Sequence, residues 1–168
     1  IESPVRRAAG AAHEWKSGEM QRVRIGVLGA SGYTGAELLR LLVGHPAAEI
    51  RWLTADRNAG QPLGALFPHL AHLGLPPLAK LAAVDLDAAD IVFCCLPHGL
   101  TQGVVSSLPA TIRVVDISAD FRLRDLAAYE ATYGKPHEAP ELQASAVYGL
   151  SEHYAAAIRQ ARIVANPD

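Results

Sequence analysis

The stretch Arg24–Leu42, RIGVLGASGYTGAELLRLL, decides the fold. Its first five residues are mostly apolar and precede a glycine-rich turn, which predicts a buried strand. A glycine recurs at every third position, at Gly26, Gly29, Gly32 and Gly35. Residues 36–42 are all strong helix formers and predict a helix that begins near Thr34. Strand, glycine turn and helix in this order form the context in which a dinucleotide-binding fingerprint is informative.

The glycines of the turn have different predicted roles. Gly29 would make the tight turn, Gly32 would leave room for a pyrophosphate, and Gly35 would let helix and strand pack closely. The helix N-terminus adds unpaired N–H groups and the positive end of the helix dipole. Polar side chains that are expected to add contacts are Ser31, Tyr33 and Thr34. We therefore expect a nucleotide here; the alternative is a glycine-rich loop without a ligand.

Composition narrows the class of protein. Half of the 168 residues are hydrophobic and 19% are charged, as in one soluble globular domain. Fifteen Lys and Arg oppose 17 Asp and Glu, so no basic face for nucleic acid is expected. No apolar run is long enough to span a bilayer, and we expect no membrane partner. The only cysteines are adjacent, which suits neither a disulfide framework nor a metal site and indicates a reducing compartment.

Strands and helices alternate after the first unit. Strands are predicted at 49–54, 90–96, 113–117 and 162–165, and a short strand or turn at 147–150. Helices are predicted at 100–108, 123–133 and 151–159, the last of them capped by Ser151. This pattern predicts an α/β fold with a doubly wound, Rossmann-like and mostly parallel sheet over residues 22–165.

Two segments fall outside this alternation. Residues 1–21 are expected to be a flexible leader, either a remnant of a targeting peptide or an overextended start before Met20. The long segment 56–80 is expected to be functional or to hold short helices. Its His69 and His72 are interpreted as packed loop residues, with a metal site as the alternative.

The ends of parallel strands are the places where such sheets bind ligands. After the second strand stand Thr54, Asp56 and Arg57. An acid here favours NAD through the ribose 2′-hydroxyl, whereas an arginine favours NADP through the 2′-phosphate. We favour NADP, with Thr54 and Arg57 at the phosphate. The alternative is a surface salt bridge between the neighbouring Asp56 and Arg57.

The third strand ends in Leu96, Pro97 and His98, which are expected to lie against the ribose or nicotinamide half of the cofactor. His98 is interpreted as a residue that lines the cofactor site, and a general base is the alternative. Cys94 and Cys95 are expected inside the strand, one facing each side of the sheet. Buried thiols have a raised pKa, so both are interpreted as inert core residues.

The fourth strand leads into Ser118, Asp120 and Arg122, where a substrate would meet the nicotinamide. The guanidinium of Arg122 suits an acyl phosphate or a carboxylate. The alternative is a capping turn in which Asp120 caps a helix and Arg122 pairs with it.

Eight ordered segments carry a family resemblance. They are GASGYTGAELLRLL, LTADRNAGQPLG, FPHL, FCCLPHG, DISADFRLRD, APELQ, AVYGLSE and ARIVANP. Together they resemble the N-acetyl-gamma-glutamyl-phosphate reductase family from about Arg22 to Pro167. The resemblance implies NADPH as cofactor and reduction of N-acetyl-glutamyl 5-phosphate to N-acetylglutamate 5-semialdehyde and phosphate in arginine biosynthesis. It also implies a separate catalytic domain, whose cysteine forms a thioester that then accepts hydride.

The resemblance places Ser118, Arg122 and Asn166 at the substrate, with Arg122 on its phosphate. The family continues Asn-Pro-Gly-Cys-Tyr, and that cysteine is the nucleophile. Here Asn166 and Pro167 are followed by Asp168, so residues 166–168 are expected to be a truncated start of the catalytic domain, and no catalytic residue is expected in this chain. We expect the complete enzyme to be a homo-oligomer of the cytoplasm, or alternatively of the plastid stroma. The alternatives for function are an NADP-binding module without catalysis and another acyl-phosphate or semialdehyde dehydrogenase.

Overall fold

The computed structural model describes residues 22–167, so the predicted leader at 1–21 lies outside the described residues, as does Asp168. The strands are β1 (Val23–Leu28), β2 (Ala48–Thr54), β3 (Leu78–Ala79), β4 (Ile91–Cys94), β5 (Arg113–Asp116), β6 (Val147–Tyr148) and β7 (Ile163–Ala165). The α-helices are α1 (Tyr33–Leu42), α2 (Leu63–Leu66), α3 (Thr101–Ser107), α4 (Leu126–Tyr133), α5 (Pro140–Ser145) and α6 (Ser151–Gln160). The 3-10 helices are η1 (Pro68–Leu73), η2 (Leu81–Ala83) and η3 (Leu86–Ala88).

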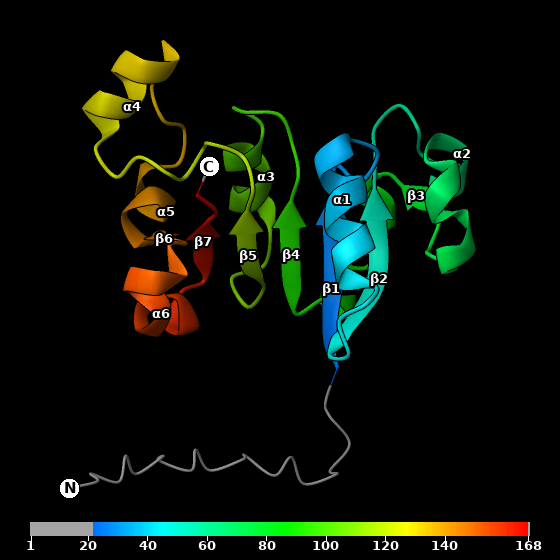
Figure 1. Cartoon of the computed structure of the whole chain (residues 1–168). Helices are drawn as coiled ribbons and strands as arrows, with labels where there is room; N and C mark the ends of the chain where they lie inside the picture. Colours follow the sequence, from blue (N-terminus) through cyan, green and yellow to red (C-terminus); the bar gives the residue numbers. More distant parts are fainter. Residues whose placement is uncertain (1–21, 168) are drawn as a thin grey trace, which may run out of the picture.

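All strand pairs in the described range are parallel, in the order β3-β2-β1-β4-β5-β7-β6. The strand arrows therefore point to one edge of the sheet (Figure 1). The chain runs from β1 outward to β3 and then returns to β4 on the other side of β1, so the order reverses between β1 and β4. Open α/β sheets bind ligands outside the strand ends at such a reversal. The predicted doubly wound, mostly parallel sheet is confirmed.

Neighbouring residues of the central strand belong to two different apolar cores. Val27 packs in one cluster with Leu39 of α1, and Leu28 packs in the other with Val105 of α3. Successive side chains of a strand point to opposite faces, so the two cores lie on the two faces of the sheet. Apolar burial on both faces explains why the strands read as continuous hydrophobic runs.

Gly26 is required for packing in the core and is not part of the turn that follows β1. A Cβ at Gly26 would lie 2.2 Å from Cζ2 of Trp52, a side chain on the neighbouring strand β2. The indole is buried over the glycine backbone, with 6% of its surface exposed. The three-residue spacing of the glycines therefore combines one packing position in β1 with three positions of the turn and helix.

The starts of α4 and α6 differ most from the predictions, whereas the other predicted helix ends differ by at most one residue. The helix predicted from residue 123 begins at Leu126, because the Asp125 carboxylate accepts hydrogen bonds from the amides of Ala127 and Ala128 at 2.8 and 3.2 Å. Ser151 is not the cap of α6: it is the first helical residue, and Leu150 occupies the cap position without a side-chain bond.

Segment 56–80 holds the short elements α2, η1 and β3, which confirms that it contains short helices. His69 and His72 both lie in η1. Within residues 22–167, no group of three or more His, Cys, Asp or Glu side chains is arranged to hold a metal ion. None of the described helices has the length and apolar character needed to cross a membrane.

Candidate functional site

A cavity of about 760 Å³ lies at the carboxyl edge of β1, β2, β3 and β4. Its volume is in the range of small-molecule and cofactor sites. Eight of the residues predicted to bind a nucleotide line it: Gly29, Ser31, Gly32, Thr34, Thr54, Arg57, Leu96 and Pro97. Three others, Tyr33, Gly35 and His98, are not among its lining residues. The cavity is therefore built from the loops that follow adjacent strands, although these loops are far apart in sequence.

Two glycines of the turn are required by the fold itself. Gly29 has a φ of 72°, and a Cβ there would lie 2.4 Å from the carbonyl oxygen of Cys95. A Cβ at Gly35 would lie 2.7 Å from Cα of Ala30. The predicted tight turn at Gly29 and close packing of the helix at Gly35 are confirmed.

Gly32 has a different environment. Its φ of −88° is open to any residue, and the nearest atom to a Cβ would be the Gly29 oxygen at 3.6 Å. It is the N-cap of α1, and no side chain caps that helix end. The first amides of a helix have no intrahelical partner, and they attract anions. Gly32 and these amides are therefore the part of the cavity lining that could hold an anion.

Tyr33 and Thr34 begin α1 but lie differently. Thr34 lines the cavity, whereas the Tyr33 ring is 88% exposed and packs edge-on against Phe67 with centroids 5.9 Å apart. The Tyr33 side chain therefore does not line the cavity as predicted. Its ring instead contacts Phe67 of segment 56–80.

Lys80, a residue that was not predicted to belong to the site, lies beside the end of β2. Asp56 forms an ion pair with Lys80, which follows β3, and this hydrogen bond lowers the pKa of Asp56. Asp56 therefore pairs across strands, where the sequence suggested a bridge to its neighbour Arg57. Arg57 and Lys80 both line the cavity. No sequence pattern pointed to Lys80, because the strand before it, β3, has only two residues.

The two cysteines occupy opposite faces of the sheet, as predicted. Cys94 is fully buried in one core, and Cys95 packs against the other. The prediction that both lie inside the strand is wrong for Cys95, because β4 ends at Cys94 and Cys95 lines the cavity. Burial, with a further contribution from Asp116, raises the pKa of Cys95 to about 12 and the pKa of Cys94 well above its usual range.

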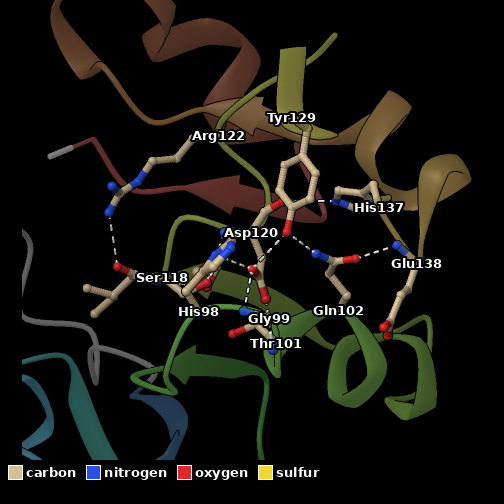
Figure 2. A network of polar contacts seen from close by, with 12 residues as sticks. His98, Gly99, Thr101, Gln102, Ser118, Asp120, Arg122, Tyr129, His137 and Glu138 are labelled. Carbon is tan, nitrogen blue, oxygen red and sulfur yellow. Dashed lines mark hydrogen bonds and ion pairs between the residues drawn. The ribbon is translucent and has the colours of Figure 1, made fainter. Parts of the chain in front are cut away.

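The His98 side chain points toward the buried carboxylate of Asp120 (Figure 2). Its Nδ1 lies 2.7 Å from Oδ1 of Asp120, and its ring stacks on Tyr133 at a centroid distance of 4.2 Å. Asp120 is fully buried and accepts from the amides of Gly99 and Thr101 at 2.7 and 3.0 Å. Asp120 thus binds amides at the start of α3 and in the loop after β4, and it does not cap the helix that follows it in sequence, whose cap is Asp125.

The network continues through side chains that the sequence did not single out. Tyr129 Oη donates to Asp120 at 3.4 Å and accepts from Nε2 of Gln102 at 2.6 Å. The amide of Glu138 donates to Oε1 of Gln102 at 2.5 Å. Burial, and next the charge of Asp120, raises the pKa of Tyr129 to about 12. These contacts join α3, α4 and the segment after α4 into one unit.

Arg122 and Asn166 lie together at the ends of β5 and β7. Arg122 donates from Nε to the carbonyl oxygen of Asn166 at 2.9 Å and from a terminal nitrogen to that of Ile117 at 3.2 Å. Ser118 is buried, and its hydroxyl donates to Asp116 at 3.0 Å. Burial raises the pKa of Asp116 despite the two hydrogen bonds from Ser118.

A second cavity, of about 790 Å³, lies beside this group. Arg122 and Arg124 line it together with Tyr133, Tyr148 and Tyr154. The first cavity thus belongs to a glycine-rich half of the fold at the ends of β1 to β4, and the second to a half that carries arginines and tyrosines, where it is lined by the segment after β5 together with α5, β6 and α6. Ser118 and Asn166 are not among the residues that line the second cavity.

Residues 24–161 match the protein family described as the semialdehyde dehydrogenase NAD binding domain. The chain belongs to this family. It therefore carries a binding domain for a nicotinamide adenine dinucleotide, and the glycine turn between β1 and α1 lies within the matched range. The choice between NAD and NADP is not part of the family description.

Named relatives extend the likeness of this semialdehyde dehydrogenase domain. A probable chloroplastic N-acetyl-gamma-glutamyl-phosphate reductase of Oryza sativa subsp. japonica is 56% identical over 152 residues, which is 90% of this chain and 36% of the relative. An N-acetyl-gamma-glutamyl-phosphate reductase of Cereibacter sphaeroides is 57% identical over 141 residues, which is 84% of this chain and 41% of the relative. The chain thus spans about two fifths of the length of these relatives.

Solved structures support the fold of the family. The chain resembles aspartate semialdehyde dehydrogenase II of Vibrio cholerae with a TM-score of 0.62 and 16% identity, over 88% of this chain and 42% of that one. It also resembles the Candida albicans aspartate semialdehyde dehydrogenase solved with NADP, with a TM-score of 0.52 and 24% identity, over 61% of this chain and 31% of that one. At these identities the likeness concerns the fold alone.

Proposed function

We propose that this chain is the NADP-binding part of an N-acetyl-gamma-glutamyl-phosphate reductase. The complete enzyme would reduce N-acetyl-glutamyl 5-phosphate to N-acetylglutamate 5-semialdehyde and release phosphate. The observation that carries this proposal is the 57% identity to a reductase of that name over 84% of the chain. The first cavity supports it, because it lies where such sheets bind a nucleotide, and Arg122, the candidate for the acyl phosphate, lines the second cavity.

The residues around the first cavity fit the cofactor. Gly32 and the first amides of α1 would receive the pyrophosphate, and Thr54 and Arg57 would face the 2′-phosphate of NADP. Leu96 and Pro97 supply apolar contacts on the opposite wall. The cofactor, when bound, supplies the hydride of the reaction. The domain's part is to orient the cofactor toward the second cavity.

Arg122, which lines the second cavity, suits the anionic substrate. Arg122 and Asn166 are adjacent, and a guanidinium pairs well with an acyl phosphate. Ser118 supports this loop through its bonds to Asp116. Cys94 and Cys95 are unsuited to nucleophilic attack, because a raised pKa leaves almost no thiolate near neutral pH.

The activity is tested on the gene product that contains this sequence. We expect it to consume NADPH with N-acetyl-glutamyl phosphate, and to reduce NADP with the semialdehyde and phosphate. Turnover of aspartyl phosphate in its place would identify another semialdehyde dehydrogenase. NADPH binding without turnover of any acyl phosphate would identify a binding module and contradict the proposed activity.

Arg122→Ala in that active protein tests the substrate assignment. Loss of a charge-assisted contact should lower kcat/KM by roughly 30- to 150-fold, or about 2–3 kcal/mol, with NADPH affinity unchanged. Arg40→Ala is the control, because Arg40 pairs with Glu37 on α1 and is more than half exposed. Equal losses in the two variants, or none in Arg122→Ala, would remove Arg122 from the substrate site.

A further inference from the structure

Strand register fixes Lys80 beside Asp56. β3 pairs in parallel with β2, so that Ala79 lies opposite Thr54, and the amide of Ala55 donates to the carbonyl oxygen of Ala79 at 3.0 Å. Asp56 and Lys80 follow these paired residues at the same sheet edge, and Nζ of Lys80 contacts Oδ1 of Asp56. Both side chains line the first cavity, next to Arg57. The position of Lys80 is therefore set by backbone pairing, although its side chain is 57% exposed.

The charges of this corner determine which ribose it can accept. A carboxylate at the end of the second strand of such a fold accepts a hydrogen bond from the ribose 2′-hydroxyl and repels a 2′-phosphate. Here the ion pair with Lys80 occupies Asp56, and its lowered pKa keeps the carboxyl ionised. With Arg57 the corner carries two cations and one anion. A phosphate monoester of charge near −2 is then attracted where Asp56 alone would repel it.

We propose that Lys80 is a specificity-determining residue for the 2′-phosphate, acting together with Arg57. It supplies a second cation for the phosphate and holds Asp56 away from the role of ribose acceptor. This inference rests on the proposed use of NADP and adds a mechanism for the choice. Removing Lys80 takes away one cation and also frees an acid that favours NAD, so the preference should change through two additive effects.

Calorimetric titrations of the chain with NADPH and NADH test the inference, and 2′,5′-ADP and 5′-AMP isolate the contribution of the phosphate. The variants are Lys80→Ala, Lys80→Met, Asp56→Asn and the double variant Lys80→Ala/Asp56→Asn. Arg51→Ala is the matched control, because it breaks an exposed ion pair with Glu49 on β2 and does not line the cavity. Circular dichroism confirms that each variant is folded.

We expect Lys80→Ala and Lys80→Met to lower the ratio of NADPH to NADH affinity at least about tenfold, with NADH binding unchanged or tighter. In the double variant, the ratio of NADPH to NADH affinity should be at least about threefold higher than in Lys80→Ala, because no free carboxylate then faces the phosphate. Arg51→Ala should leave both affinities unchanged. The same pattern should hold for 2′,5′-ADP against 5′-AMP.

The failures can be told apart. An unmodified chain that prefers NADPH and keeps that preference in both Lys80 variants overturns this inference and leaves Arg57 as the determinant. Equal weakening of NADPH and NADH assigns Lys80 a structural role and also overturns it. An unmodified chain that binds both nucleotides equally overturns the proposed use of NADP, and the role of Lys80 fails with it.

Discussion

At the scale of single residues, two glycines of the turn are required by the packing of the chain, and a third is not. Gly29 and Gly35 are glycines because this chain's own atoms lie 2.4 and 2.7 Å from the place of a Cβ. Gly32 has no such neighbour, and its backbone angles suit any residue. The fold itself therefore does not require a glycine at position 32, and the role that we propose for it is to leave room for the pyrophosphate.

This contrast predicts different outcomes for two substitutions to valine. Gly32→Val should leave the chain folded and weaken NADPH binding at least about 100-fold, because its side chain stands where the phosphates approach. Gly35→Val should lose stability by several kcal/mol through overlap with Ala30, on the order of a severe overpacking change. Thermal unfolding and a binding titration on the same samples separate the effects. Normal NADPH binding by Gly32→Val would show that the turn carries no phosphate.

The cysteines give a pH prediction at the same scale. A pKa of about 12 for Cys95, against an ordinary value of 9.0, leaves roughly a thousandth of the usual thiolate at pH 8. Alkylation by iodoacetamide should be slower than that of a model thiol by about this factor and should rise about tenfold per pH unit while the chain stays folded. Mass spectrometry over a pH series measures it. Rapid alkylation of the folded chain at pH 8 would identify a reactive thiol.

At the scale of elements, buried hydrogen bonds fix the loops that follow the strands of the sheet. Asp120 links the start of α3, the ring of His98 and Tyr129 of α4 (Figure 2). These partners come from two segments, residues 98–101 and α4, and a network inside a low-dielectric core is strong only when each member is satisfied. The geometry of the loop after β4 and of its contact with α4 therefore depends on this buried carboxylate.

Two aspartate substitutions measure this dependence. Asp120→Ala should reduce the free energy of unfolding by about 3–5 kcal/mol, because it leaves buried donors without an acceptor. Asp125→Ala removes a carboxylate that also accepts two backbone amides, but at the exposed start of α4, and should cost about 1 kcal/mol. Denaturant titrations give both values. Equal costs would mean that the Asp120 network contributes no more than an ordinary helix cap.

Local patterns predicted the elements better than the contacts between them. The strand, turn and helix of residues 24–42 were predictable because apolar runs, glycines and helix formers act within a few residues. Lys80 and the Asp120 network were not, since β3 has two residues and the partners of Asp120 are up to 22 positions away in sequence. His98 shows the same limit: its position after β4 was predicted, but its direction depends on Asp120 of another loop.

At the scale of the whole molecule, the two cavities are lined by different elements of the fold. In the sheet, β3, β2, β1 and β4 lie on one side and β5, β7 and β6 on the other (Figure 1). The first side carries the glycine turn and the first cavity at its carboxyl ends, and the other half of the molecule carries Arg122, Arg124 and the second cavity.

This division predicts where a bound nucleotide changes backbone protection. Saturating NADPH at about 100 times its Kd should stabilise the chain by about 2.7 kcal/mol. Hydrogen exchange should slow most in residues 29–35, 54–58 and 95–100, which line or border the first cavity. Helices α4 and α6 lie in the other half. Their hydrogen exchange should slow only by the amount that the increased free energy of global unfolding explains. Exchange followed by mass spectrometry, with and without NADPH, measures this difference. Protection centred on α4 and α6 would place the nucleotide in the arginine half and reverse the assignment of the two cavities.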